Sequence, residues 1–135
     1  MGRVNPCDAD VLIRDEGEHL VFNGRKSFST GSKVSDVTVL EGTNTHVFAI
    51  VPSNQPGLTF HDDWDNIGQR LIESGSVTIT EVQVPWSDAA GFVDRVFQPR
   101  TYNTLNVPTI QLVFSNFYLG IARGALEEAA LPTAR

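Results

Sequence analysis

The stretch LVFNGRKSFSTG, residues 20–31, joins a short apolar run to an Asn-Gly pair and then to a run in which Phe28 and Thr30 alternate with serines. Asn and Gly together favour positive φ at both central positions of a turn. Asn23-Gly24 therefore predicts a reversal of the chain into a further strand that begins near Lys26. Side chains two residues apart on a strand point to the same face, which would place Phe28 beside Thr30. The stretch predicts a β-rich fold built from hairpins.

Further short apolar runs lie on both sides of this stretch and are bounded by turn-forming residues. A first hairpin is predicted where Asp15-Glu16-Gly17-Glu18 separates residues 11–13 from residues 20–22. The β-branched and apolar residues of 37–40 and 47–51 predict two more strands. Strands therefore account for most of the first half of the chain.

The apolar alternation in residues 76–84 predicts another strand, and its phase changes after Ile79. An inserted residue near Thr80-Glu81 would produce this change as a β-bulge. A turn is expected at Gln55-Pro56-Gly57. At least six strands with short connections indicate a mainly β fold, an antiparallel barrel or sandwich. Residues 86–100, which hold aspartates, a glycine and prolines, are interpreted as a surface linker.

One long helix is predicted after the linker. Asn106 suits an N-cap, Pro108 suits the first turn, and residues 109–130 contain no further proline. The apolar residues of this helix occupy most of its circumference, so it requires burial on several sides, as in a bundle. They are Ile110, Leu112, Val113, Phe114, Phe117, Tyr118, Leu119, Ile121, Ala125 and Leu126. Polar residues such as Gln111 and Arg123 interrupt the ~20 apolar residues that a membrane span needs.

No other segment has the length and period to pack against this helix. The sequence thus predicts that the chain oligomerises through the helix, or that it is a fragment whose remaining bundle helices lie beyond Arg135. The ending LPTAR, residues 131–135, breaks the helix as a truncation or an altered reading frame would. We expect residues 1–100 to form a β-domain with its linker, and residues 101–135 to form the first helix of an incomplete bundle.

Composition excludes several classes of protein. The 135 residues, 41% hydrophobic and 19% charged, fit one soluble domain, and the net charge of -6 argues against nucleic acid as a partner. The N-terminus lacks the apolar run of a secretory signal, so a cytoplasmic location without membrane attachment is expected. Cys7 is the only cysteine, cannot form an intramolecular disulfide and is treated as incidental.

Three segments, in order along the chain, resemble the acyl-CoA dehydrogenase superfamily. Residues 20–31 resemble its Asn-Gly-x-Lys-x-(aromatic)-x-(Ser/Thr) stretch, residues 63–76 its Gly-x-Arg segment before the closing strand, and residues 111–126 the opening helix of its C-terminal bundle. Three stretches are closest to dibenzothiophene monooxygenase and related sulfur-acquisition oxidoreductases: FSTG at 28–31, the Asp-Asp-Trp-Asp run at 62–65 and FYLGIA at 117–122. The resemblance covers nearly the whole chain.

The resemblance implies roles for six residues. The Phe28 ring is expected to pack on the isoalloxazine of a flavin, and Thr30 to bond near its reactive nitrogen, with Ser29 between them also at the cofactor. A connection near the flavin and the mouth of the substrate site is expected to hold the other three, Trp64, Gly68 and Arg70.

Two alternatives concern the charged residues of this connection. Arg70 would instead form a surface ion pair with Glu73 or Asp65. His61-Asp62-Asp63 with Asp65 resembles a metal-ligand cluster, but consecutive carboxylates on an extended segment point to opposite faces, and no second cluster completes an oxygen cage. Neither a metal site nor a catalytic residue is therefore assigned.

The resemblance further implies FMN or FAD as cofactor and a small-molecule substrate. The favoured chemistry is oxygenation of an organosulfur compound, with reduced flavin supplied by a separate reductase; the alternative is α,β-dehydrogenation of an acyl thioester by a true acyl-CoA dehydrogenase. The family's catalytic glutamate or histidine belongs to bundle helices beyond Arg135, so the chain alone is expected to bind flavin weakly or not at all and to be inactive. A non-catalytic β-domain that binds a protein or a sugar is the alternative from another class.

Overall fold

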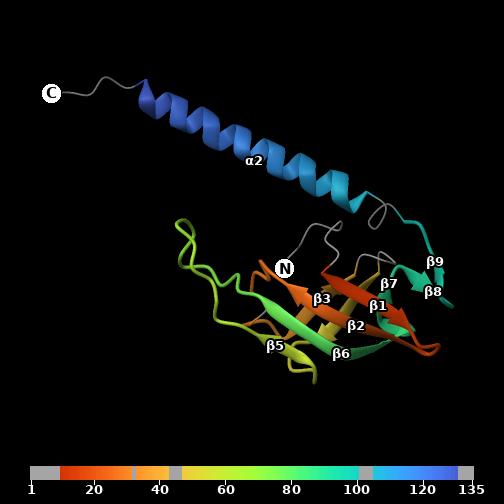
Figure 1. Ribbon diagram of the computed structural model, residues 1–135. Helices are drawn as coiled ribbons and strands as arrows, with labels where there is room; N and C mark the ends of the chain where they lie inside the picture. The colour runs from red at the N-terminus through yellow and green to blue at the C-terminus, as the bar shows by residue number, and fades with distance from the viewer. Residues whose placement is uncertain (1–9, 32, 43–46, 101–104, 131–135) are drawn as a thin grey trace. The chain divides into compact units, whose positions relative to one another are not determined.

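The computed structural model describes residues 10–31, 33–42, 47–100 and 105–130. Cys7 and the chain ending at 131–135, both interpreted above, lie outside the described residues. The chain divides into two compact units, Met1–Gln98 and Pro99–Arg135. The first unit carries the β-structure and the second carries the helix (Figure 1).

Within the described residues, the first unit consists of short strands and one 3-10 helix. In chain order these are β1 Val11–Asp15, β2 His19–Lys26, β3 Val37–Glu41, β4 Phe48–Pro52, β5 Leu58–Phe60, β6 Val77–Pro85, the 3-10 helix η1 Trp86–Asp88, β7 Ala89–Ala90, β8 Phe92–Val93 and β9 Val96–Phe97. The strands at 11–13, 20–22, 37–40, 47–51 and 76–84 are thereby confirmed.

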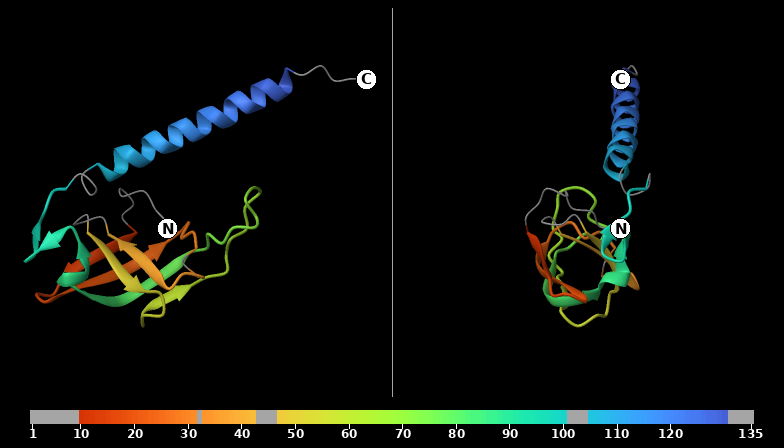
Figure 2. Two further views of the ribbon diagram at one scale, coloured as in Figure 1. Left: turned by 180° about the vertical axis from the view of Figure 1, so that it is seen from behind. Right: turned by 90° about the vertical axis from the view of Figure 1, so that its right-hand side faces the viewer.

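Two antiparallel sheets enclose the core. The larger has the order β1-β2-β6-β5 and the smaller has the order β3-β4-β7, while β8 and β9 form a separate hairpin. Side chains from both sheets meet in one cluster, which makes the unit a sandwich of open sheets (Figure 2). The cluster contains Val11, Ile13, Leu20, Phe22, Leu40, Val47, Ala49, Val51, Ile79, Val82, Val84 and Ala89. The mainly β, antiparallel prediction is confirmed in its sandwich form.

The predicted bulge in β6 is confirmed. The β2–β6 register shifts between Phe22 and Gly24, so Thr80 and Glu81 together stand opposite Asn23, and Glu81 has a φ of 49°. The Asn23 side chain accepts a hydrogen bond from the Glu81 backbone N–H at 2.8 Å and donates one to the Glu81 carboxylate at 2.6 Å. The extra residue restores inward-facing apolar positions on both halves of the strand.

The reversal predicted at Asn23-Gly24 is wrong, as is the separate strand near Lys26. Strand β2 runs straight through both residues to Lys26. Gly24 has a φ of 148°, and a Cβ on it would lie 1.8 Å from the carbonyl oxygen of Asp10. Asn23 and Gly24, which commonly make a tight turn, have other roles in this chain. The Asn23 side chain holds the bulge at Glu81, and Gly24 allows the close approach to Asp10 because it has no Cβ.

Residues 86–100 were wrongly interpreted as a linker throughout. Ala89 is buried in the core, and β7 pairs with β4 through Ala89 and Ala90. The Phe92 ring packs between those of Trp86 and Phe97, with ring centroids 5.3 and 5.4 Å apart and the planes tilted by 56° and 60°. Elements two residues long give too few alternations for a pattern to reveal them.

The second unit contains the predicted helix, α2 Asn106–Ala129. Leu105 takes the N-cap position and makes no side-chain cap hydrogen bond, so the assignment of Asn106 as the cap is wrong. The large apolar side chains on α2 are exposed, from Phe114 at 49% to Leu126 at 71%. In the described parts of the chain, no helix has both the length and the hydropathy to cross a membrane.

Candidate functional site

Three segments that are distant in sequence meet at one end of the larger sheet. Strand β6 lies between β2 and β5 and is antiparallel to both. The residues that follow β2, the residues that follow β5 and the residues that precede β6 are therefore neighbours (Figure 1). These are residues 27–31, 61–65 and 73–76, which hold four of the six residues predicted for the site.

Backbone hydrogen bonds extend the sheet pairing into these segments. Ser29 donates its N–H to the Gly75 carbonyl at 3.0 Å, and Gly31 donates to that of Glu73 at 2.9 Å. On the other side, His61 donates to the Ser76 carbonyl at 2.9 Å. A Cβ on Gly75 would lie 2.3 Å from the His61 carbonyl oxygen, so only glycine lets the segments approach this closely.

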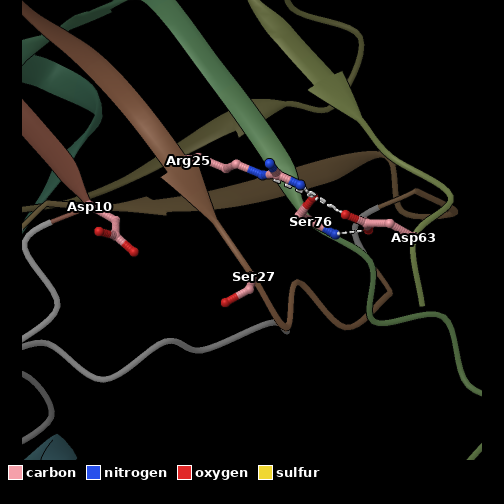
Figure 3. Close-up of a pocket in the computed structure, with 5 residues that line it drawn as sticks. All are labelled: Asp10, Arg25, Ser27, Asp63 and Ser76. Atoms are coloured by element: carbon pink, nitrogen blue, oxygen red, sulfur yellow. Dashed lines mark hydrogen bonds and ion pairs between the residues drawn. The ribbon is translucent and has the colours of Figure 1, made fainter. Parts of the chain in front are cut away.

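Asp63 joins the segment 61–65 to Ser76 and to Arg25 near the end of β2. Its carboxylate accepts a 2.7 Å hydrogen bond from the Ser76 backbone N–H and a 2.5 Å bond from the Ser76 hydroxyl. Arg25 donates to the same carboxylate at 3.0 Å and to the Ser76 hydroxyl at 2.9 Å. Figure 3 shows Arg25 and Asp63 converging on Ser76, while Asp10 and Ser27 line the rest of a pocket of about 400 Å³.

These bonds stabilise the charged form of Asp63. Hydrogen bonds from the Ser76 hydroxyl and backbone N–H, with a smaller contribution from Arg25, lower the pKa of Asp63 to about 2. Both Asp63 and Ser76 belong to the second segment of the family resemblance, but no sequence pattern predicts the bonds between them. In the described residues, no group of three or more His, Cys, Asp and Glu side chains is placed to hold a metal ion.

The Phe28 ring meets Trp64 at this end of the sheet. The two ring centroids are 5.7 Å apart with an interplanar angle of 79°, and Phe28 remains 58% exposed. Phe28 has a φ of 58° and lies beyond the end of β2, two residues after Lys26, so strand alternation does not position it as predicted. Both rings line a pocket of about 210 Å³, with Ser74 and Ser76 on its wall.

Two hydroxyls of the site, from Thr30 and Ser74, join the segments 27–31 and 73–76. Thr30 and Ser74 share a hydrogen bond of 2.6 Å between their hydroxyl oxygens. Ser29 is buried, and its N–H is committed to the bond with Gly75. The structure therefore offers Phe28 as an exposed aromatic surface and the Thr30–Ser74 pair as the nearby polar group.

Gly68 and Arg70 occupy the exposed part of the connection. Arg70 forms an ion pair with Asp65 at 3.4 Å, as the alternative interpretation had it, and both side chains are more than two-thirds exposed. Gly68 has open space around its Cβ position. Trp64 donates its indole N–H to the Gln69 carbonyl at 3.0 Å, which gives the connection an internal anchor.

Comparisons with known proteins give the class to which this geometry belongs. No protein-family model matches the chain. A glutaryl-CoA dehydrogenase from Mycobacterium smegmatis, in complex with FADH2, matches 63% of the chain at 22% identity with a TM-score of 0.54, which shows the fold alone. The β-sandwich followed by a helix is thus part of an acyl-CoA dehydrogenase fold.

Nearer relatives are monooxygenases. The chain is 33% identical, over 93% of its length, to a protein of Pseudomonas putida named probable FMNH2-dependent monooxygenase SfnC. It is 35% identical over 98% of its length to the methanesulfinate monooxygenase MsuC of Pseudomonas fluorescens, with a TM-score of 0.72. It is 34% identical over 91% to the dibenzothiophene monooxygenase TdsC of Paenibacillus sp. A11-2 in its FMN-bound form, with a TM-score of 0.66.

These matches confirm the family resemblance. The chain is homologous to the dibenzothiophene and SfnC-type monooxygenases, which share the acyl-CoA dehydrogenase fold. It spans about a third of their length: 33% of SfnC, 36% of MsuC and 34% of TdsC.

Proposed function

We propose that this chain is the flavin-contacting β-domain of an FMN-dependent monooxygenase that oxygenates a small organosulfur compound. The observation that carries the proposal is the match to FMN-bound TdsC over 91% of the chain at 34% identity. The matches to MsuC and SfnC, whose printed names also describe monooxygenases, support it.

The residues at the sheet end fit one edge of a flavin. A flat aromatic ring system packs well on an exposed aromatic side chain, and Phe28, held by its contact with Trp64, provides one. The Thr30 hydroxyl can accept the hydrogen bond from Ser74 and donate its own proton to a polar atom at the flavin edge. Ser29 contributes through the backbone, because its N–H bond to the Gly75 carbonyl fixes the chain between Phe28 and Thr30.

Bound FMN would supply the activation of oxygen, and the chain would hold the ring and shape one wall of the substrate site. Trp64, Gly68 and Arg70 are proposed on the substrate side, where Trp64 adds apolar surface and the Asp65–Arg70 pair closes the connection. None of the described residues is assigned as the catalytic acid or base. A separate reductase is proposed as the source of reduced flavin.

Flavin binding by the 135-residue chain alone is expected to be weak, and turnover absent. The chain corresponds to about a third of its relatives, so most flavin contacts would come from elsewhere. Each ~1.4 kcal/mol of missing interaction weakens binding tenfold. A chimera of TdsC, in which this chain replaces the matching third, would restore those contacts.

The test is FMN titration of that chimera, followed by flavin fluorescence. Phe28→Ala is expected to weaken FMN binding about tenfold or more, because it removes an aromatic contact of ~1–3 kcal/mol, and Thr30→Ala by less. Val93→Ala, an exposed apolar residue on β8, is the matched control and should change nothing. Unchanged binding in both site variants would remove Phe28 and Thr30 from the flavin site.

A further inference from the structure

A buried ion pair joins the two sheets directly before the proposed flavin segment. Lys26, the last residue of β2, lies 3.8 Å from Glu41, the last residue of β3, measured from Nζ to Oε2. The two side chains are only 9% and 7% exposed. Strand β2 belongs to the larger sheet and β3 to the smaller, so the pair spans the sandwich.

Stability alone does not explain a pair in this position. Removing two charges from water costs several kcal/mol per ion, and well-packed apolar residues often replace such a pair without loss of stability. What an ion pair adds is a directional link, since each charge must stay near the other. Here the link fixes the end of one sheet against the end of the other.

The end of β2 is where the flavin segment starts. Lys26 is opposite Val77 in the β2–β6 ladder, and only Ser27 separates it from Phe28, whose φ is 58°. After Phe28, the next backbone contact with a neighbour is the Ser29 bond to Gly75. Phe28 thus lies between two fixed positions, Lys26, which is held by its ion pair and by the β2–β6 ladder, and Ser29, which is bonded to Gly75.

We propose that Lys26 and Glu41 are positioning residues for the flavin: their ion pair across the sandwich orients the segment 27–30 and so holds the Phe28 ring against Trp64. The flavin part of this inference rests on the function proposed above. The effect of the ion pair on the orientation of Phe28 does not depend on flavin and can be tested in the chain alone.

The experiment compares the wild-type 135-residue chain with Lys26→Met/Glu41→Leu, Lys26→Arg and a control, Lys33→Met. The control breaks the exposed pair between Lys33 and Asp62, at 3.1 Å, in the same region. Nuclear Overhauser contacts between the Phe28 ring and the Trp64 indole report orientation, and thermal unfolding reports stability. The apolar double variant should keep a cooperative transition and lose the Phe28–Trp64 contact, whereas Lys26→Arg and Lys33→Met should keep both.

The same substitutions in the TdsC chimera test the effect of the ion pair on FMN binding. There the apolar double variant should weaken FMN binding about tenfold or more, and Lys26→Arg, which keeps the ion pair, should keep most of the affinity. A Phe28–Trp64 contact that survives in the folded double variant overturns the inference. Loss of the contact with unchanged FMN affinity also overturns it. If the wild-type chimera did not bind FMN, the proposed function would be refuted. The Phe28–Trp64 contact in the isolated chain would still test whether the ion pair orients Phe28.

If the double variant does not fold, Glu41→Gln, which keeps the shape of the side chain and removes its charge, replaces it under the same criteria. Its partial loss of the contact, measured as reduced Overhauser intensity, supports the inference, and full intensity overturns it.

Discussion

At the scale of single residues, Asp63 does the most to hold the candidate site together. It accepts bonds from the Ser76 backbone, the Ser76 hydroxyl and the Arg25 guanidinium, and these donors lie directly before β6 and near the end of β2. A carboxylate with several donors is favoured in its charged form, and the low pKa of Asp63 follows from this. One charged side chain thereby links the connection 61–65 to the start of β6 and the end of β2.

The first prediction concerns acid stability. The pKa of Asp63 is about 2 in the folded chain and about 3.9 in an unfolded chain. Its contribution to stability is therefore complete above about pH 4 and is lost as the pH falls through about 2. Asp63→Asn lacks this contribution, so the difference in urea midpoint between wild type and variant should be largest above about pH 4 and shrink towards about pH 2.

Ser76→Ala provides the companion test, because it removes the largest cause of the shift. The pKa of Asp63, followed by NMR titration of its carboxyl carbon, should rise towards its ordinary value in this variant. A titration of Asp63 that is the same with and without the Ser76 hydroxyl would contradict the assignment of cause.

At the scale of elements, residue patterns predicted the strands that alternate and missed the features that depend on partners. Residues 76–84 showed both the strand and its bulge, because burial of one face imposes the alternation. Asn23-Gly24 predicted a turn wrongly, because the roles of both residues depend on partners distant in the sequence. Asn23 bonds to Glu81 of β6, and Gly24 lies against the carbonyl of Asp10. The contact between Phe28 and Trp64 depends on the β5–β6 pairing, which no local pattern encodes.

The prediction at this scale concerns the step in the ladder at Gly24. Gly24→Ala would force a Cβ to 1.8 Å from the Asp10 carbonyl oxygen and should destabilise the chain by about 3 kcal/mol, as overpacking does. Gly68→Ala is the matched control, because the space around Gly68 is open, and it should change stability by less than about 0.5 kcal/mol. Urea unfolding of both variants makes the comparison; equal stabilities would show that the chain relaxes easily around Gly24.

At the scale of the whole molecule, helix α2 exposes apolar side chains that a folded protein normally covers. Leu112, Phe117, Leu119 and Leu126 are each more than 60% exposed. Single exposed apolar residues are ordinary, but a helix that is apolar around its circumference requires partners. We therefore expect the isolated chain to self-associate through α2.

Sedimentation velocity over a range of concentrations tests this expectation. Burial of one large apolar side chain contributes about 2 kcal/mol, so Phe117→Gln with Leu119→Gln should weaken association at least about tenfold. The exposed β-domain variant Val93→Gln should leave it unchanged. A monomer at all concentrations, with no binding of a hydrophobic dye, would show that α2 needs no partner.

The central claim is that the end of the larger sheet, at Phe28 and Thr30, contacts a flavin, and the most direct measurement is a crystal structure of the TdsC chimera grown with FMN. The predicted result is electron density for the isoalloxazine within van der Waals contact of the Phe28 ring and within hydrogen-bonding distance of Thr30, with Trp64 on the substrate side. Isoalloxazine density bound only by TdsC residues, with Phe28 and Thr30 turned away from it, would contradict the account.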